Sequence, residues 1–374
     1  MKQTEGDPSA GREVTIYDVA EKAGVAASTV SRTFSRPDRV SFKTAEKIRA
    51  AAAELGYRTE LATRRLDARE AGERFNLIGM ISADIQNPFF LELLRGAEHA
   101  ALTQKMVVTV ADSSESLPRS QQAVERLLPH VDGLLLASSR LSSGEVQKIA
   151  RSVPTVVLNR PVPGVPSVMV DNYEGAIKAA IHLEDQGSRS ITYLAGPENS
   201  WADATRWRGL IEAVGNTEAS SPTVTFTRST TLSLEQVRRL ARISVHRMLV
   251  DEPTIRGGRR VFESWRKNPT DAVLCFNDLV AIGFMKQAQH AGLRIPEDVA
   301  VVGFDNTELT TIISPSLTTV AGPLTTVGRV ATANLIALIK GVELPLARPR
   351  VLPTRLIVRE SSMRRTPRAR RIDP

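Results

Sequence analysis

The stretch VTIYDVAEKAGVAASTVSR, residues 14–32, decides the fold of the N-terminal part of this chain. Val19, Ala20 and Ala23 recur at helical spacing, so they form one small apolar face of a short helix. Gly24 follows, and glycine readily adopts the left-handed backbone conformation that ends a helix. The pattern therefore predicts a helix that stops in a tight turn.

A second short helix follows that turn. Val25 fills the turn, and Val30 is placed to pack back against the apolar face of the first helix. Small residues let two helices cross closely, as they do in a helix-turn-helix that reads the major groove of DNA. The outward face of the second helix then presents Ala27, Ser28, Thr29, Ser31 and Arg32. A surface hairpin with a merely solvated polar face is the alternative interpretation.

Residues 42–57, FKTAEKIRAAAAELGY, predict a third helix, with Ser41 as its N-cap and Gly56 at its end. Its apolar side chains fall at helical spacing: Ala45, Ile48, Ala52 and Leu55. Residues 32–49 hold six Lys or Arg against two acidic residues, so this side of the module is positive and suits phosphate.

These residues resemble the LacI/GalR family of bacterial transcriptional regulators. The resemblance extends over nearly the whole chain from residue 14 to residue 360, because further family motifs follow in one order at compatible spacings. Those motifs read DIQNPFF, PTVVLNRPVPGVPSVMVDN, CFNDLVAIGF, IPEDVAVVGFDN and SPSLTTV.

Composition limits the class of protein. A chain of 374 residues, 42% of them hydrophobic, can bury more than one core, which accommodates a small reader and a larger α/β body. The lone Cys275 excludes an intramolecular disulfide framework and is expected to be a packed side chain. Neither a signal peptide nor an apolar run of about 18 residues is present, so we expect a cytoplasmic protein without a membrane partner. The five histidines stand singly, so we expect no metal and no cofactor.

Beyond residue 77, β-rich apolar runs alternate with amphipathic helical stretches, which predicts parallel sheets wrapped by helices. The resemblance implies a body like a periplasmic binding protein, with two doubly wound parallel-sheet subdomains after an all-α helix-turn-helix headpiece. The expected boundaries are a headpiece at 14–58, a hinge helix and linker at 59–76, a body at 77–361 and a basic tail at 362–374. We expect the first subdomain at about 77–170 and 305–326, and the second at about 171–304 and 327–361. In the stretch 215–246, which is longer than is usual in the family, we expect only a helix near 234–243.

The resemblance also implies DNA-contacting residues. The matching base-reading positions are Ala27, Ser28 and Arg32, of which Arg32 can make two hydrogen bonds to a guanine edge, worth about 1–3 kcal/mol of discrimination. Thr15, Thr29, Ser41 and Thr44 match phosphate-contacting positions, although each could equally cap a helix. Leu66 matches the leucine that a hinge helix inserts into the minor groove. The chain departs from the family pattern here, with Thr59, Glu60 and Thr63 in place of the usual residues.

Polar side chains follow several predicted strands, where ligands of parallel sheets bind. The positions that match the family's effector site are Asp84, Asn87, Phe89, Phe90, Asn159, Arg206, Asn277, Asp278 and Asp305. Carboxylates and amides pair with hydroxyl groups, and a phenylalanine ring can cover the apolar face of a sugar, although either phenylalanine could simply be core. Two departures are Pro253, where an aromatic residue is common, and Gly322, where a polar side chain usually reaches the ligand.

We therefore expect a sequence-specific transcriptional regulator, and a repressor rather than an enzyme, that binds a pseudo-palindromic double-stranded DNA operator as a homodimer. The resemblance implies control by a small-molecule effector, a sugar or nucleoside, bound between the two subdomains. One alternative is a regulator of the same fold whose co-regulator is a protein. Another is a sugar-binding transport protein, which would need an export signal and no headpiece.

Overall fold

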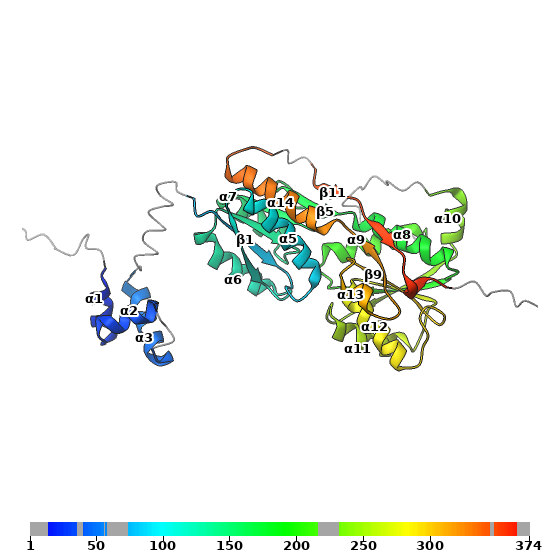
Figure 1. Cartoon of the computed structure of the whole chain (residues 1–374), viewed down its shortest axis with the longest axis horizontal. Helices are drawn as coiled ribbons and strands as arrows, with labels where there is room; N and C mark the ends of the chain where they lie inside the picture. Colours follow the sequence, from blue (N-terminus) through cyan, green and yellow to red (C-terminus); the bar gives the residue numbers. More distant parts are fainter. Residues whose placement is uncertain are drawn as a thin grey trace, which may run out of the picture. The chain divides into compact units, whose positions relative to one another are not determined.

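The computed structural model describes residues 14–35, 40–55, 57, 74–215, 232–344 and 348–364. The chain forms two compact units that divide between Arg74 and Phe75, a headpiece and a body, drawn in Figure 1. The predicted hinge helix with Leu66, the end of the third helix at Gly56 and most of the basic tail lie outside the described residues.

The headpiece consists of three helices: α1 (Ile16–Ala23), α2 (Ala27–Ser35) and α3 (Phe42–Leu55). Gly24 ends α1 in the left-handed region with a φ of 60°, as the turn requires. The headpiece has its own core, in which the buried side chains are Val19, Ala20, Ala23, Val30, Ile48, Ala51 and Ala52. The predicted helix-turn-helix and third helix are therefore confirmed.

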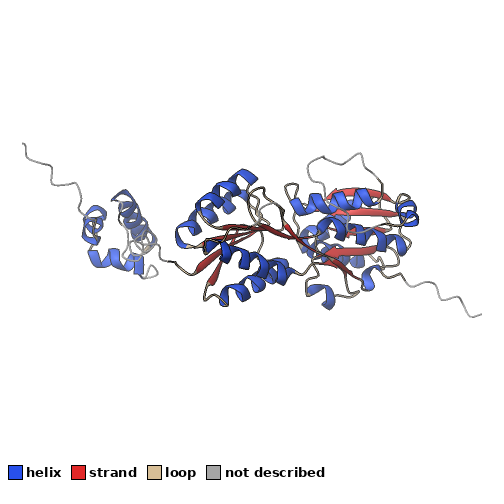
Figure 2. Ribbon diagram, turned by 90° about the horizontal axis from the view of Figure 1, so that it is seen from above, coloured by secondary structure: helices blue, strands red, loops and turns tan. Residues whose placement is uncertain are grey.

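The body contains two six-stranded sheets, each covered by helices on both faces (Figure 2). The first sheet has the order β11-β5-β4-β3-β1-β2, and its described strand pairs are all parallel. Its strands are β1 (Leu77–Ser82), β2 (Val107–Asp112), β3 (Gly133–Ala137), β4 (Thr155–Leu158), β5 (Ser167–Val170) and β11 (Arg350–Leu352). Helices α5 (Pro88–Leu102) and α14 (Leu324–Ile339) cover one face, and α6 (Leu117–Leu127) and α7 (Ser143–Ser152) the other. We call this sheet with its helices the first lobe.

The second lobe contains the sheet of order β12-β10-β9-β8-β6-β7, in which only the β10–β12 pair is antiparallel. Its strands are β6 (Ser190–Ala195), β7 (Ser244–Leu249), β8 (Ala272–Cys275), β9 (Ala300–Phe304), β10 (Thr318–Ala321) and β12 (Arg355–Ile357). Helices α8 (Asn172–Asp185), α9 (Trp201–Ala213) and α10 (Leu234–Leu240) pack on one face. Helices α11 (Ile255–Trp265) and α12 (Asp278–His290) cover the other face. The remaining described elements are the short helix α13 (Leu309–Ile312) and two 3-10 turns, Leu128–His130 after α6 of the first lobe and Glu360–Ser362 after β12.

The allocation of C-terminal segments to the lobes differs from the prediction. Strand β10 belongs to the second lobe, because it pairs with β9 and β12. Helix α14 belongs to the first lobe, because its apolar side chains Val327, Ala331 and Leu335 enter the core that α5 and β4 line. The expected allocation was therefore wrong for β10, α14 and β11, whereas β12 lies in the second lobe as expected.

The described chain passes between the lobes three times, after β5, after β10 and between β11 and β12. These crossings contact one another: the N–H of Asp171 donates to the carbonyl of Leu352 at 2.9 Å, and the hydroxyl of Thr354 donates to the carbonyl of Asp171 at 3.0 Å. Within the described chain, no helix is both long enough and apolar enough to span a bilayer. The fold class that the sequence predicts is confirmed.

Candidate functional site

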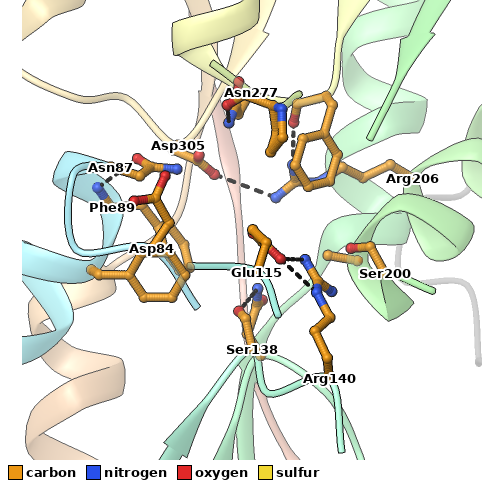
Figure 3. A pocket seen from close by; sticks show the side chains of 15 residues that line it. Asp84, Asn87, Phe89, Glu115, Ser138, Arg140, Ser200, Arg206, Asn277 and Asp305 are labelled. Carbon is orange, nitrogen blue, oxygen red and sulfur yellow. Dashed lines mark hydrogen bonds and ion pairs between the residues drawn. The ribbon is translucent and has the colours of Figure 1, made fainter. Parts of the chain in front are cut away.

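A cavity of about 430 Å³, part of it open to solvent, lies in the body where strands of both sheets end (Figure 3). Eight of the nine predicted effector residues line it: Asp84, Asn87, Phe89, Phe90, Asn159, Arg206, Asn277 and Asp305. The first five come from the first lobe and the other three from the second. Because parallel strands end at the same edge of a sheet, the fold brings together side chains that are distant in the sequence.

The first lobe presents an amide and two aromatic rings. Asn87 is the N-cap of α5, and its Oδ1 accepts the N–H of Phe89 at 3.0 Å. The rings of Phe89 and Phe90 meet edge to face with 5.0 Å between centroids, and both are nearly buried in the first lobe's core. Asn87 thus caps α5 and the two rings pack in the core, and all three residues also line the cavity.

Arg206 and Asp305 form the most buried charged pair of the cavity. The Arg206 side chain is 2% exposed and its Nη2 lies 3.3 Å from Oδ1 of Asp305. Its Nε donates to Asn172 at 2.9 Å, and its Nη1 donates to the Phe276 carbonyl. The guanidinium also stacks 3.8 Å from the centre of the Phe304 ring. These contacts of Nε, Nη1 and Nη2 and the ring of Phe304 fix the position of Arg206, so it is a fixed cation in the wall of the cavity.

Asp278 is the predicted residue that the cavity excludes. It is fully buried, with Oδ1 accepting the hydroxyl of Thr319 at 2.6 Å and Oδ2 accepting the N–H of Thr307 at 2.7 Å. The expectation that it contacts the effector is therefore wrong: as the first residue of α12, it points into the second lobe. Burial raises the pKa of both Asp278 and Asp305 above the ordinary range, against the opposing effect of Arg206.

A chain of amide hydrogen bonds runs behind the cavity from one lobe to the other. The amide of Asn159 donates to Oγ of Ser138 at 3.0 Å, and Asn172 donates to Oδ1 of Asn159 at 3.5 Å. Asn172 then accepts from Arg206 of the second lobe. Asn172 directly follows the first crossing between the lobes. The polar groups of the two lobes are therefore hydrogen-bonded to each other at this crossing.

Sequence reasoning missed several lining residues. Nε and Nη2 of Arg140 both contact the carboxylate of Glu115. Burial raises the pKa of Glu115, and the charge of Arg140 opposes that rise. The further lining residues are Ser138, Ser200, Ala202 and Phe276, together with Pro253, which the sequence already marked as a departure from the family pattern. Glu115, Arg140 and Ser200 follow the strands β2, β3 and β6, so the strand-end signal that found the others was present for these as well. Among the described residues, no three His, Cys, Asp or Glu side chains gather as a metal site would require.

The two departures from the family pattern have different surroundings. Pro253 lines the cavity, and its carbonyl accepts the amide of Asn277 at 2.9 Å. Gly322 lies at the second crossing, where an added Cβ would stand 2.5 Å from Cγ1 of Val170. A side chain at 322 would collide with the end of β5, so glycine permits this close crossing.

In the headpiece, the predicted base-reading residues lie on α2, with Ser28 and Arg32 exposed and Ala27 half-buried. Three of the four predicted phosphate-contacting residues, Thr15, Ser41 and Thr44, have local side-chain partners. The carboxylate of Asp18 accepts both the N–H and the hydroxyl of Thr15 at 2.6 Å, and Oγ of Ser41 accepts the N–H of Thr44 at 3.3 Å. The Thr15 hydroxyl proton is therefore occupied in the free headpiece, whereas Arg32 projects from the outward face.

A helix-turn-helix unit followed by a two-lobed binding body defines the class of ligand-responsive DNA-binding proteins. The family model described as bacterial regulatory proteins of the lacI family matches residues 15–60, and the periplasmic binding protein-like domain matches 180–362. The ribose operon repressor of Halalkalibacterium halodurans is 33% identical over 93% of this chain and 97% of its own length. The chain belongs to the LacI family of bacterial regulatory proteins, and it is a DNA-binding transcriptional regulator.

Two solved structures resemble the whole chain. The transcriptional regulator CelR in complex with cellobiose has a TM-score of 0.63 at 26% identity, covering 93% of this chain and all of that one. The Lac repressor dimer, bound to operator and an anti-inducer, has a TM-score of 0.64 at 25% identity, covering 94% of this chain and all of that one. The predicted family is confirmed.

Proposed function

We propose that this protein is a repressor whose affinity for its operator is set by a polyhydroxylated small molecule in the cavity of the body. The observation that carries the proposal is that both lobes supply polar walls to one cavity, around the buried pair of Arg206 and Asp305. Relatives named for ribose and solved with cellobiose support a carbohydrate as the ligand.

The proposed mechanism is a shift between two arrangements of the lobes. A ligand that hydrogen-bonds Asn87 on one lobe and Asp305 on the other binds best at one separation of the two walls. It stabilises that arrangement by the difference between its affinities for the two arrangements. The three crossings are the points about which such a movement would occur.

We propose that the headpiece binds the major groove through α2, with Arg32 reading a guanine. The Lac repressor, whose structure covers 94% of this chain, is a dimer on its operator. By analogy, two copies of this chain would present two headpieces to a pseudo-palindromic site. The protein would act in the bacterial cytoplasm, and regulation rather than catalysis would be its role.

The experiment is a titration of the full chain with sugars and nucleosides, reading operator affinity by fluorescence anisotropy. Asp305→Ala would strand the Arg206 guanidinium without its carboxylate, so Asp305→Asn, which keeps an oxygen for Arg206, is the sharper variant. We expect Asp305→Asn to weaken effector binding by about 1–3 kcal/mol, because a buried hydrogen-bond acceptor for ligand hydroxyls is lost.

The matched control is Asp298→Asn, on an exposed carboxylate that pairs with Arg294 on the surface of the second lobe. It should leave the effector response unchanged. If Asp305→Asn binds and responds like the parent protein, the cavity is not the effector site, and a protein co-regulator becomes the better account.

A further inference from the structure

The loop that follows β9, residues 305–307, has an unusual backbone where it enters the wall of the cavity. The φ of Asp305 is 108° and that of Asn306 is 57°. Residues with a side chain seldom adopt positive φ, and Asp305 lies well beyond the left-handed minimum near about +57°. Two such residues in succession persist only where the surrounding structure holds them, and strain of this kind occurs at ligand-binding sites. We call residues 305–307 the Asp305 loop.

Strand β10 provides the first contacts that hold this loop. The N–H of Asp305 donates to the carbonyl of Val320 at 2.8 Å, and the N–H of Asn306 donates to the hydroxyl oxygen of Thr319 at 3.2 Å. Both acceptors lie in β10, next to the β9 strand that leads into the loop. The backbone of the loop is therefore attached to the sheet of the second lobe.

Asp278 provides the second set of contacts. Its Oδ2 accepts the N–H of Thr307 at 2.7 Å, and its Oδ1 accepts the Thr319 hydroxyl at 2.6 Å. Gly303 leaves room for this carboxylate, because an added Cβ there would lie 2.4 Å from Oδ1 of Asp278. The residue that the sequence suggested as an effector contact thus holds the Asp305 loop from behind.

Arg359, which lies just after β12, provides the third set. Its Nη2 donates to Oδ1 of Asn306 at 2.8 Å, and its Nη1 donates to the carbonyl of Leu317 at 2.7 Å. Asn306 closely follows β9 and Leu317 directly precedes β10, so the planar fork of the guanidinium joins both ends of this connection. Among the described residues that line the cavity, Arg359 is absent. It reaches the cavity only through Asn306, the neighbour of Asp305.

The chain around Arg359 is itself fixed to the start of β10. The N–H of Arg359 donates to Oγ1 of Thr318 at 2.8 Å, and the same hydroxyl donates to the carbonyl of Arg359 at 2.9 Å. Oε2 of Glu360 accepts the N–H of Ser316 at 2.8 Å, and Oγ of Ser361 accepts that of Thr318 at 2.9 Å. The guanidinium therefore extends to the Asp305 loop from a segment with a defined position.

We propose that Arg359 is a positioning residue for effector binding, which acts by holding Asn306 so that the strained Asp305 loop presents its carboxylate to the cavity. This inference rests on the proposed function and adds a residue of the C-terminal segment to it. Arg206 holds the Asp305 side chain, and Arg359 holds the backbone that carries it. A ligand that meets a carboxylate already in place loses less conformational entropy on binding.

The first test needs no ligand. Hydrogen exchange of the full chain is followed by mass spectrometry for the parent protein, Arg359→Met and Arg355→Met. Arg355 is an exposed arginine of β12, so its variant is the matched control. We expect the N–H groups of residues 305–307 to exchange roughly tenfold faster or more in Arg359→Met alone, because local opening becomes easier.

Strand β6 of the same lobe is the internal reference for this measurement. A general loss of stability would accelerate the exchange of β6 together with the Asp305 loop, whereas loss of a positioning contact accelerates the loop alone. Equal exchange in all three proteins, or equal acceleration of β6 and the loop in Arg359→Met, would overturn the proposal.

The second test is a double-mutant cycle on effector binding. Calorimetry with the sugars and nucleosides of the titration above, beginning with ribose and cellobiose, compares Arg359→Met, Asn306→Gly and the double variant. Glycine tolerates positive φ, so Asn306→Gly removes the acceptor of Arg359 without adding strain. We expect each single variant to weaken binding by roughly tenfold and the double variant to be no weaker, because both changes remove one contact. Additive losses would refute the coupling.

Arg359→Lys is the conservative variant, and it serves if Arg359→Met does not fold. It keeps the charge and can reach Asn306, but it cannot hold Asn306 and Leu317 together as the fork does. Its affinity for the bound sugar or nucleoside should lie between that of the parent protein and that of Arg359→Met. An affinity as low as that of Arg359→Met, with the loop exchanging as in the parent protein, would count against the proposal.

The outcomes separate this inference from the proposed function. If one of these compounds binds the parent protein and changes its operator affinity, while Arg359→Met binds it equally well, the positioning role is refuted and the effector cavity stands. If none of them binds the parent protein, the proposed function is refuted for sugars and nucleosides, and this inference is refuted with it.

Discussion

Arg206 illustrates how a single side chain sets the character of the cavity. A guanidinium that is 2% exposed is tolerable only because Asn172, Asp305 and the rings of Phe276 and Phe304 replace its water. The same contacts fix its position, so it presents a constant charge to whatever enters. Burial removes water from the carboxyl groups of Asp278 and Asp305, so it raises the pKa of both, although the charge of Arg206 acts in the opposite direction.

The raised pKa of Asp305 predicts a pH-dependent stability. The Asp305 carboxyl group holds its proton more tightly in the folded state than in the unfolded chain. Its contribution to the free energy of unfolding is therefore complete below the pKa of the unfolded state and is lost as the pH rises through the pKa of the folded state. Urea unfolding between about pH 5 and pH 8 should therefore show Asp305→Asn losing less free energy of unfolding with rising pH than the parent protein.

Asp278, whose pKa burial raises to about 7, titrates in the same window and interacts with Asp305, so the difference between the two proteins reports on this pair of carboxyl groups together. His182, whose pKa burial lowers, titrates in both proteins and cancels in the difference. Asp298→Asn is the control, because pairing with Arg294 lowers the Asp298 pKa to about 2, below the tested window. Equal slopes for Asp305→Asn and the parent protein would contradict the prediction.

Arg32 is the long donor among the three base-facing positions, and it is exposed on α2. We expect Arg32→Ala to lose about 1–3 kcal/mol of specific operator binding per half-site, while salt-sensitive binding to scrambled DNA persists. Gel-shift titrations on both DNAs at several salt concentrations measure this. An equal loss on both would identify Arg32 as a phosphate contact instead.

The sequence pattern identified polar residues at strand ends that line the cavity, but it did not identify which of two adjacent residues faces the cavity at the start of a helix. Polar residues after β1, β4, β8 and β9 do line the cavity, as parallel topology requires. Asn277 and Asp278 are adjacent in sequence, yet only Asn277 faces the cavity, because α12 begins between them and rotates Asp278 inwards. The orientation of that first turn depends on tertiary packing against β10, which no local pattern encodes.

Among the elements, the pair α5 and α14 holds the first lobe together. An added Cβ at Gly96 would lie 1.9 Å from the carbonyl oxygen of Thr325, and one at Gly328 would lie 1.9 Å from that of Leu93. The two backbones thus touch at reciprocal glycines. Helical periodicity cannot say which lobe a helix will join, so the expectation for residues 327–361 placed most of α14 in the wrong lobe.

We predict that Gly328→Ala costs about 1–3 kcal/mol of unfolding free energy or more, because the methyl group overlaps a backbone carbonyl that cannot move without parting the helices. Gly144→Ala in α7 is the control: nothing lies within 4 Å of its added Cβ, and alanine should stabilise the helix by up to about 1 kcal/mol. Chemical unfolding of both variants measures the contrast. A neutral Gly328→Ala would show that the crossing is looser than described.

At the scale of the whole molecule, headpiece and body have separate cores. We predict that a chain starting at Phe75 folds with the thermal midpoint of the intact body and binds effector normally, but does not bind operator. Calorimetry and gel shift on the truncated protein test this. Loss of effector binding on truncation would mean that the headpiece contributes to the cavity.

The three crossings also bear on how the protein is made. Because α14 and β11 leave the ribosome after nearly all of the second lobe, the apolar side of α5 and β4 stays uncovered until synthesis is almost complete. The core of the headpiece, by contrast, draws its buried residues from α1, α2 and α3 at the start of the chain. We therefore expect prematurely terminated chains to carry a folded reader on an exposed, protease-sensitive body. Rapid clearance of such fragments would matter, since each retains α2 and could occupy DNA without responding to any ligand.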